Sequence, residues 1–293
     1  MCSSLASRVA SAAAAIRRAK AVYITAGAGM GVDSGLPDFR GRTGLWKEYP
    51  PLQQRDLDFS DMANPDWFID DITFAWGFYG HRLNLYRRTV PHEGFRILQR
   101  WAEARPRGCF VFTSNVDGQF QKAGFDHAVL ECHGSIHHLQ PLHPRDGSDL
   151  LDASGFELPE VDPQTLRLPA ESVPRDATGS VLRPNILMFN DWGWDSSRTD
   201  RQQRHHGQWL RELQASGCPA VVIECGAGTA IPTVRRASES AAHLLGCPLI
   251  RINPRESAVQ TQHPNPSAVP SQIEAIPLEL SSLDALQQLD SAL

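Results

Sequence analysis

A glycine-rich segment near the N-terminus is the first candidate for chemistry. Residues 26 to 41 read AGAGMGVDSGLPDFRG and follow an apolar run, Val22 to Thr25, that is typical of a buried strand. Gly27 and Gly29 leave room for a diphosphate to approach the backbone, and a helix beginning two residues later would direct free N–H groups at it. Val32 stands where the dehydrogenase fingerprint has its third glycine, so a tight strand-to-helix connection is the alternative interpretation.

Further polar residues follow other apolar runs. They are Asn115 with Asp117, then His133, then Gly228 with Thr229, and finally Asn253. Open α/β sheets bind ligands at the carboxyl ends of their strands, so one crevice can hold these residues together with the glycine-rich segment. Each has a structural alternative, because Asn and Asp favour turns and a lone histidine is commonly a core residue.

The elements that would position these residues alternate along the chain. The apolar runs that predict strands are Val22 to Thr25, Cys109 to Thr113, Val129 to Cys132, Ile186 to Phe189, Ala220 to Cys225 and Leu249 to Asn253, with a short final strand at Glu274 to Ile276. Helical spacing follows at residues 91–104, 202–216, 233–245 and 283–293, and at residues 5–16 before the first strand. Strands that are apolar on both faces predict a doubly wound, Rossmann-like α/β fold with a parallel sheet.

Two insertions interrupt this pattern. Residues 45–88 are rich in Trp, Phe and Tyr and predict a helical insert with its own core, whereas residues 139–182 are rich in Pro, Asp and Ser and predict a loop-rich segment. We therefore expect a single domain over residues 1–293. Its core would cover residues 1–44, 89–138 and 183–293, and a smaller lobe would be formed by the two insertions.

Composition excludes several classes of protein. The formal charge is −5 and no long Lys or Arg block occurs, so bulk charge gives no reason to expect nucleic acid binding. The six cysteines are scattered without C-x-x-C spacing, which favours reduced, mostly buried thiols and a cytoplasmic protein. The Arg-containing N-terminus resembles a transit peptide, but its helical spacing favours a packed helix, and no run is apolar enough to cross a membrane. The oligomeric state stays open.

Four blocks, in this order, resemble the sirtuins, the NAD-dependent protein deacylases. Residues 34–41 resemble the family's SGIPDFRG, and TSNVD at 113–117 resembles its TQNID. ECHGS at 131–135 resembles its E-x-HGS, and LRPNILMFND at 182–191 resembles its LRPxVVxFGE. Residues 228–230 and the pair 252–253 resemble the late GTS and I-N motifs, so the resemblance extends over nearly the whole chain.

The resemblance implies that NAD lies across the crevice. The acyl oxygen of an acylated lysine would attack the nicotinamide ribose as nicotinamide leaves, and His133 would be the general base for a ribose hydroxyl. Asn115 and Asp117 would order the ribose, a water and the carboxamide, while Arg40 would meet the diphosphate and Phe39 would screen the reactive carbon from water. The cofactor-binding set that it implies is Gly27, Ala28, Gly29, Asp38, Phe39, Arg40, Ser114, Asn115, Asp117, Gly226, Gly228, Thr229 and Asn253.

The implied substrate-binding set departs from the family. It consists of Met188, Phe189, Asn190, Asp191 and Trp192, with FND in place of FGE. Trp192 and Trp194 are either anchors for an unusual substrate or a lid over the core. Ser114 replaces the family's glutamine.

The largest departure concerns zinc. The family holds a structural zinc with two C-x-x-C pairs, and here no cysteine lies between Cys132 and Cys218. We therefore expect no metal site, with His137, His138 and His143 solvated or hydrogen-bonded, and His205 and His206 facing solvent. Packing of Leu139, Leu142, Leu150, Phe156 and Leu168 would order the lobe instead.

Three functions follow from these observations. The first is an NAD-dependent protein lysine deacylase that releases nicotinamide and O-acyl-ADP-ribose. The second is an NAD glycohydrolase or ADP-ribosyl transferase that uses the same pocket, which the altered substrate segment and Ser114 favour. The third is an NAD-binding sensor with little turnover, against which the retained HGS motif argues.

Overall fold

A six-stranded parallel sheet forms the main lobe of the computed structural model, which describes residues 4–38, 41–125, 127–143, 150–262 and 272–293. The strand order is β3-β2-β1-β7-β8-β9. Their bounds are β1 Ala21–Ala26, β2 Cys109–Thr113, β3 Val129–Glu131, β7 Ala220–Cys225, β8 Leu249–Ile252 and β9 Ala275–Leu278. Register pairs Val22 with Cys109 on one side and with Val221 on the other.

Helices cover both faces of this sheet because its strands are apolar on both faces. The helices of the main lobe are α1 Leu5–Arg18, α2 Gly29–Val32, α8 Glu93–Glu103, α9 Gln119–Lys122, α10 Ser197–Ser216, α11 Thr233–Leu245 and α12 Ser282–Ala292. Val22 and Ile24 pack with α1, α8 and α12, while Tyr23, which lies between them, packs on the other face with α10 and α11. The predicted Rossmann-like fold is confirmed.

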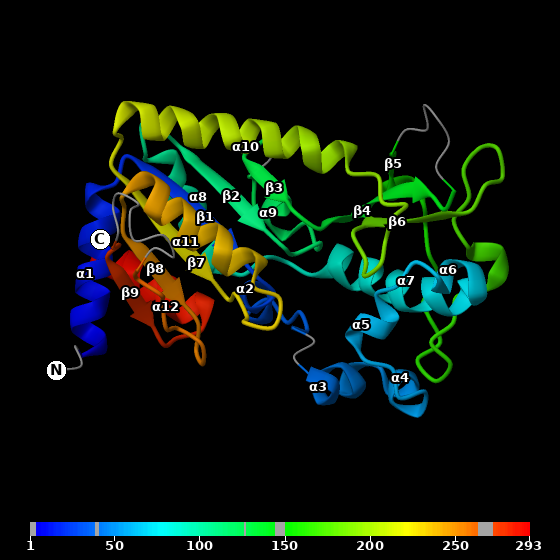
Figure 1. Ribbon diagram of the computed structural model, residues 1–293. Helices are drawn as coiled ribbons and strands as arrows, with labels where there is room; N and C mark the ends of the chain where they lie inside the picture. The colour runs from blue at the N-terminus through cyan, green and yellow to red at the C-terminus, as the bar shows by residue number, and fades with distance from the viewer. Residues whose placement is uncertain (1–3, 39–40, 126, 144–149, 263–271) are drawn as a thin grey trace.

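The smaller lobe has an antiparallel sheet of its own, in the order β5-β4-β6. Its strands are β4 Gly134–Pro141, β5 Leu151–Asp152 and β6 Leu182–Ile186. Its helices are α3 Gly41–Glu48, α4 Pro50–Gln54, α5 Phe59–Met62, α6 Trp67–Asp70 and α7 Ile72–Arg88, with two short 3₁₀ turns at Ala153–Gly155 and Ala170–Ser172. Figure 1 shows this lobe on the right, beyond the carboxyl ends of the main strands.

One hydrophobic core joins the two insertions. Leu45, Trp76 and Tyr79 from the first insertion pack with Leu139 and Leu168 from the second, and Trp76 Nε1 donates to the Leu182 carbonyl at 2.9 Å. β4 runs across the predicted boundary at residue 138, so the second sheet begins within the segment that we assigned to the main lobe.

Three predictions are wrong or displaced. Residues 186–189 are not a strand of the main sheet, because β6 ends at Ile186 and pairs with β4 instead. The helix expected from about Gly31 is the four-residue α2, which begins at Gly29. His206 does not face solvent, since its ring is buried against Tyr23, Phe110 and Phe112.

The N-terminal helix is confirmed. Ser4 caps α1, and Val9, Ala12, Ala13 and Ile16 are buried against the main sheet and α12. In the described part of the chain, no helix is both long enough and apolar enough to cross a membrane. The cytoplasmic location stays a prediction.

Candidate active site

Two glycine-rich loops meet at the carboxyl edge of the main sheet. A methyl group on Gly27 would lie 2.9 Å from the Cα of Ala227, and one on Gly29 would lie 2.7 Å from the Cα of Gly226. The N–H of Gly29 donates to the Gly226 carbonyl at 3.0 Å. Gly27 and Gly29 are therefore required for the close contact of two loops, in addition to any room that they leave for a ligand.

Asn115 and Asp117 extend from the end of β2 toward these loops. Asn115 Nδ2 donates to the Gly27 carbonyl at 3.0 Å, which ties the β2 end to the β1 loop. Asp117 Oδ1 accepts from the Gln119 N–H at 2.9 Å, and its Oδ2 would lie 3.7 Å from a methyl group on Gly31. Asp117 thus caps a turn, which is the structural role that an Asp at this position can have without any ligand. Its Oδ2 also faces the glycine-rich segment.

Asp117 lies in an unusual electrostatic environment. Burial, with a smaller contribution from the nearby Glu131 carboxylate, raises the pKa of Asp117 to about 6, although Arg82 and the bond from Gln119 oppose the shift. The carboxyl group therefore changes charge close to neutral pH. Perturbed groups of this kind are concentrated in functional sites.

His133 follows β3 and is held by the backbone on both sides. Its carbonyl accepts from the Leu187 N–H at 3.0 Å, and the next residue, Gly134, has a φ of 76°. A methyl group on Gly134 would lie 2.1 Å from the Asn185 carbonyl oxygen, so only glycine permits this contact. Burial lowers the pKa of His133, which favours the neutral imidazole that a general base needs.

The first turns of α10 hold the strand end that carries His133. All three polar groups of Glu131 have partners there. Its N–H donates to Gln202 Oε1 at 3.1 Å, its carbonyl accepts from Thr199 Oγ1 at 3.2 Å, and its carboxylate pairs with Arg198 at 2.5 Å. We did not identify Arg198 from the sequence. The available signal was Glu131, an acid inside an apolar strand, which requires a partner.

The loops after β7 and β8 are locked together. Asn253 is fully buried, and its Nδ2 donates to the Ala227 carbonyl at 2.9 Å while its Oδ1 accepts from the N–H groups of Arg255 and Glu256. Thr229 Oγ1 donates to Glu256 Oε1 at 2.5 Å. The side chain of Asn253 is thus occupied by the protein, whereas Gly228 borders open space, since a methyl group there would meet only Glu256 Oε2, at 3.9 Å.

Arg235 joins the same two loops from α11. Its guanidinium donates to the carbonyls of Ala227 and Glu256, and its side chain is largely buried. This residue also escaped the sequence analysis, because an arginine on a helix is more often exposed.

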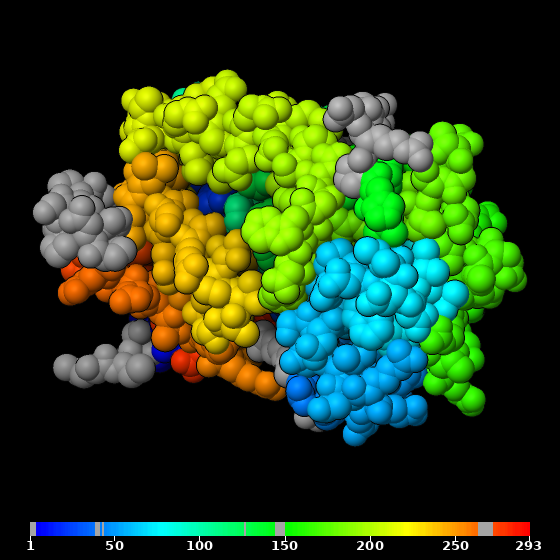
Figure 2. All heavy atoms as spheres, turned by 45° about the vertical axis from the view of Figure 1, so that its right-hand side comes forward, coloured from blue at the N-terminus to red at the C-terminus, as the bar shows by residue number. Residues whose placement is uncertain are grey.

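The expected substrate segment lies between the two lobes. Figure 2 shows the yellow-green residues after β6 between the yellow residues after β7 and the cyan helices of the insertion. Met188 is buried, Phe189 is half exposed and Trp192 is exposed. The Asp191 carboxylate is fully buried and pairs with both terminal nitrogens of Arg183, at 2.7 and 2.8 Å, so it stabilises the loop from within.

The remaining predicted residues are placed as follows. Ala28 is exposed beside the glycines, and Ser114 and Asp38 are half-buried at the same edge of the sheet. Phe39 and Arg40 lie outside the described residues, so their roles stay predictions.

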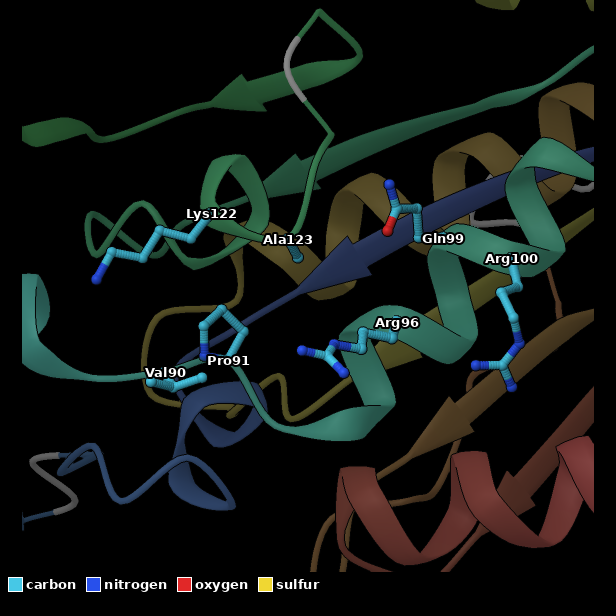
Figure 3. A pocket seen from close by; sticks show the side chains of 7 residues that line it. All are labelled: Val90, Pro91, Arg96, Gln99, Arg100, Lys122 and Ala123. Atoms are coloured by element: carbon cyan, nitrogen blue, oxygen red, sulfur yellow. The ribbon is translucent and has the colours of Figure 1, made fainter.

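A separate hollow of about 350 Å³ lies between α8 and α9, away from His133. Figure 3 shows Arg96, Gln99 and Arg100 of α8 along it, with the Lys122 side chain extending away from them. The Lys122 ammonium donates to the carbonyls of Tyr86, Arg87 and Thr89, and Arg100 pairs with Asp290. Lys122 is therefore hydrogen-bonded, and Arg100 ion-paired, within the protein.

The sequence of the smaller lobe does not supply the cysteine pairs of the family's structural zinc site. No cysteine occurs between Cys132 and Cys218, and among the described residues no group of three or more His, Cys, Asp and Glu side chains could hold a metal ion. His137 Nε2 lies 3.0 Å from the Asp117 carbonyl, and burial lowers the pKa of His138 to about 4.

These features define a class: a Rossmann-like α/β protein with a partly buried histidine and two packed glycine loops at the carboxyl ends of its strands. The profile of the Sir2 family matches residues 27–199. An NAD-dependent protein deacetylase of Halalkalibacterium halodurans is 36% identical over 221 residues, which cover 72% of this chain and 82% of that protein. The chain belongs to the Sir2 family, the sirtuins.

Other relatives agree. An NAD-dependent protein deacylase of Deinococcus radiodurans is 28% identical over 83% of this chain and 87% of its own length. One from Aquifex aeolicus is 30% identical, with a match that covers 59% of its length. The crystal structure of a Sir2 homologue in complex with NAD has a TM-score of 0.65 and 21% identity over 96% of this chain and 92% of that one, which supports the fold.

Proposed function

We propose that the protein is an NAD-dependent protein lysine deacylase that releases nicotinamide and O-acyl-ADP-ribose. The observation that carries this proposal is the position of His133. It is a partly buried imidazole beside the end of β3, burial lowers its pKa, and its own carbonyl accepts a hydrogen bond from the Leu187 N–H at the start of the substrate segment. The names of the relatives favour deacylation over the two alternatives.

A dinucleotide would bind at the carboxyl edge of the main sheet. The two glycine loops are in contact there, and the space beside Gly228 is open and bordered by Glu256. Gly27 to Gly29, Ser114, Asn115, Asp117 and Gly226 to Thr229 would hold NAD, with Asn253 and Arg235 fixing the loops. When bound, NAD supplies an anomeric carbon from which nicotinamide can leave.

The residues of the chain then have separate tasks. An imidazole nitrogen of His133 accepts the proton of a ribose hydroxyl, because burial keeps this ring neutral down to a lower pH than usual. Asn115, fixed by Gly27, and Oδ2 of Asp117 orient polar groups at the reacting end. Met188 and Phe189 exclude water from the acyl-lysine side.

We also infer that packing, rather than zinc, orders the smaller lobe. Leu139 and Leu168 are buried in its core, Leu142 and Phe156 pack against that core, and Leu150 is half-buried. Arg167 supplies a further tie, since it donates to both carboxylate oxygens of Asp71 at 2.6 Å.

The experiment is product analysis by mass spectrometry with NAD and a mixed library of acyl-lysine peptides. Nicotinamide release should depend on the peptide, and the second product should be an acylated ADP-ribose. His133→Ala should abolish turnover while NAD affinity changes by less than about tenfold, roughly 1.4 kcal/mol. His205→Ala is the matched control, because His205 is exposed on α10.

Two results would contradict the proposal. Turnover like that of the wild type in His133→Ala would remove the assigned base. Rapid release of free ADP-ribose and nicotinamide without any peptide would identify a glycohydrolase instead.

A further inference from the structure

Trp192 is the most exposed large apolar side chain among the described residues. It is 98% exposed, and it lies in the loop of residues 187–195, called the Trp192 loop below, together with the half-exposed Leu187 and Phe189. Because its indole lies outside the core, Trp192 does not act as a lid over the core. Tryptophan is enriched among the residues that carry most of the energy of protein interfaces.

The Trp192 loop is ordered before any ligand binds. The buried Asp191 carboxylate accepts from the Gly193 N–H as well as from Arg183, and Gln140 Nε2 donates to the Gly193 carbonyl at 2.7 Å. Asn190 adopts a φ of 56°, a left-handed conformation that asparagine tolerates. Binding to such a loop therefore costs little further ordering of its backbone.

The first three backbone N–H groups of this loop are already hydrogen-bonded within the protein. The N–H of Leu187 donates to the His133 carbonyl at 3.0 Å, that of Met188 to Asp191 Oδ2 at 3.3 Å, and that of Phe189 to the Ala63 carbonyl at 2.8 Å. A peptide strand added here cannot receive these three hydrogen bonds. Side chains must therefore supply much of its affinity.

The segment that contacts the loop is acidic. Residues 56–71 contain six aspartates and no lysine or arginine, and Ala63, which binds Phe189, lies within it. Asp61, Asp66 and Asp70 are exposed and form no ion pair with another described residue. Figure 2 shows this cyan segment next to the Trp192 loop.

We propose that Trp192 determines substrate specificity by packing its indole against the cationic side chain of an arginine or lysine beside the acyl-lysine. This proposal rests on the proposed deacylase function. A guanidinium over an indole gains a cation–π interaction, and the carboxylates of the segment that contacts Phe189 attract the same charge. The substrate class is thus a basic protein segment.

The test compares two acetyl-lysine peptides that differ only in charge. One carries arginine on both sides of the acyl-lysine, and the other carries citrulline, its neutral isostere, at the same places. We expect kcat/KM to be about tenfold higher for the arginine peptide, mostly through KM. Trp192→Ala should remove most of that preference, Trp192→Phe should keep part of it, and Asp61→Asn with Asp66→Asn should reduce it. Val90→Ala, which alters an exposed apolar side chain elsewhere, should leave it unchanged.

Equal kcat/KM for the two peptides in the wild type, or a full preference in Trp192→Ala, would overturn the inference. If neither peptide is turned over with NAD, the proposed function fails. The inference is then decided by fluorescence anisotropy of the labelled peptides, where equal affinity for both would refute it and tighter binding of the arginine peptide would support it.

Discussion

Each lobe contains one arginine that is fully buried against a carboxylate, and the two pairs differ in their surroundings. Arg251 and Glu224 are register neighbours on β8 and β7, and their atoms approach to 2.5 Å. Arg183 lies on the edge strand β6, and its partner Asp191 lies in the Trp192 loop. One pair is therefore part of a central sheet, and the other joins a sheet to a loop.

The difference indicates what each pair stabilises. Arg251 also donates to Glu239 and to the Ala258 carbonyl, and Ser238 donates to Glu224, so this network joins β7, β8, α11 and the loop after β8. The Asp191 carboxylate binds only groups between residues 183 and 193 among the described residues. Breaking the first pair should destabilise the whole fold, and breaking the second should release one loop.

The largest effect is expected at Glu224. Glu224→Ala leaves the Arg251 charge buried without its main partner, which costs about 3–5 kcal/mol of the free energy of unfolding. Urea unfolding should show a lower midpoint, whereas Glu239→Ala, which removes a partly exposed partner, should cost far less. Equal losses in the two variants would show that the central pair has no special role.

Asp191→Ala should separate stability from substrate binding. Because the loop can open and hydrate Arg183, we expect a smaller loss of about 2 kcal/mol, together with a rise in the peptide KM of tenfold or more and little change in KM for NAD. Asp191→Asn should recover part of the peptide affinity, since its amide oxygen still accepts from Arg183. If Asp191→Ala loses as much stability as Glu224→Ala and its peptide KM is normal, the two pairs do not differ in role.

Asp117 follows β2, and among the described residues its carboxylate accepts a hydrogen bond from the Gln119 N–H, not from a cation. Its pKa is raised from 3.8 to about 6, so the folded state keeps the proton to higher pH than the unfolded state, and stability is lost as pH rises from about 4 through 6. Asp117→Asn should therefore gain about 3 kcal/mol in the free energy of unfolding at pH 7 and little at pH 4, while turnover falls. Urea unfolding at pH 4 and at pH 7 measures the gain in stability. An equal gain at the two pH values would show that ionisation of Asp117 does not cause it.

The main lobe could be predicted from the sequence because its pattern is local. The runs at residues 109–113 and 220–225 match β2 and β7, and the helical spacing at 233–245 matches α11. Continuous apolar runs identify strands that are covered on both faces, and no partner has to be known. The resemblance added residues such as Asn115, Asp117 and His133, which the fold brings to one edge of the sheet.

The rest depended on contacts between distant residues. Residues 186–189 are more apolar than residues 182–185, yet the latter form β6 because they pair with β4 and Arg183 pairs with Asp191. His206 lies in a polar stretch of α10, and it is buried because its ring packs against Tyr23 of β1 and Phe110 of β2. Asp191 matched a substrate motif, but its carboxylate is turned inward by Arg183.

The smallest expected effect is that of metal removal from the smaller lobe. Chelators destabilise a lobe whose loops are ordered by a metal, because the ligands cannot order them alone. Here Pro141 and Pro144 occupy the positions of one cysteine pair and Arg175 and Thr178 those of the other, so four thiolates cannot assemble. The ties that replace them are Arg167 with Asp71 and the packing of Leu139 and Leu168, none of which EDTA affects. We expect no stoichiometric zinc by elemental analysis and no change in Tm or activity with EDTA. One equivalent of tightly held zinc per chain would contradict this and direct attention to His137, His138 and His143.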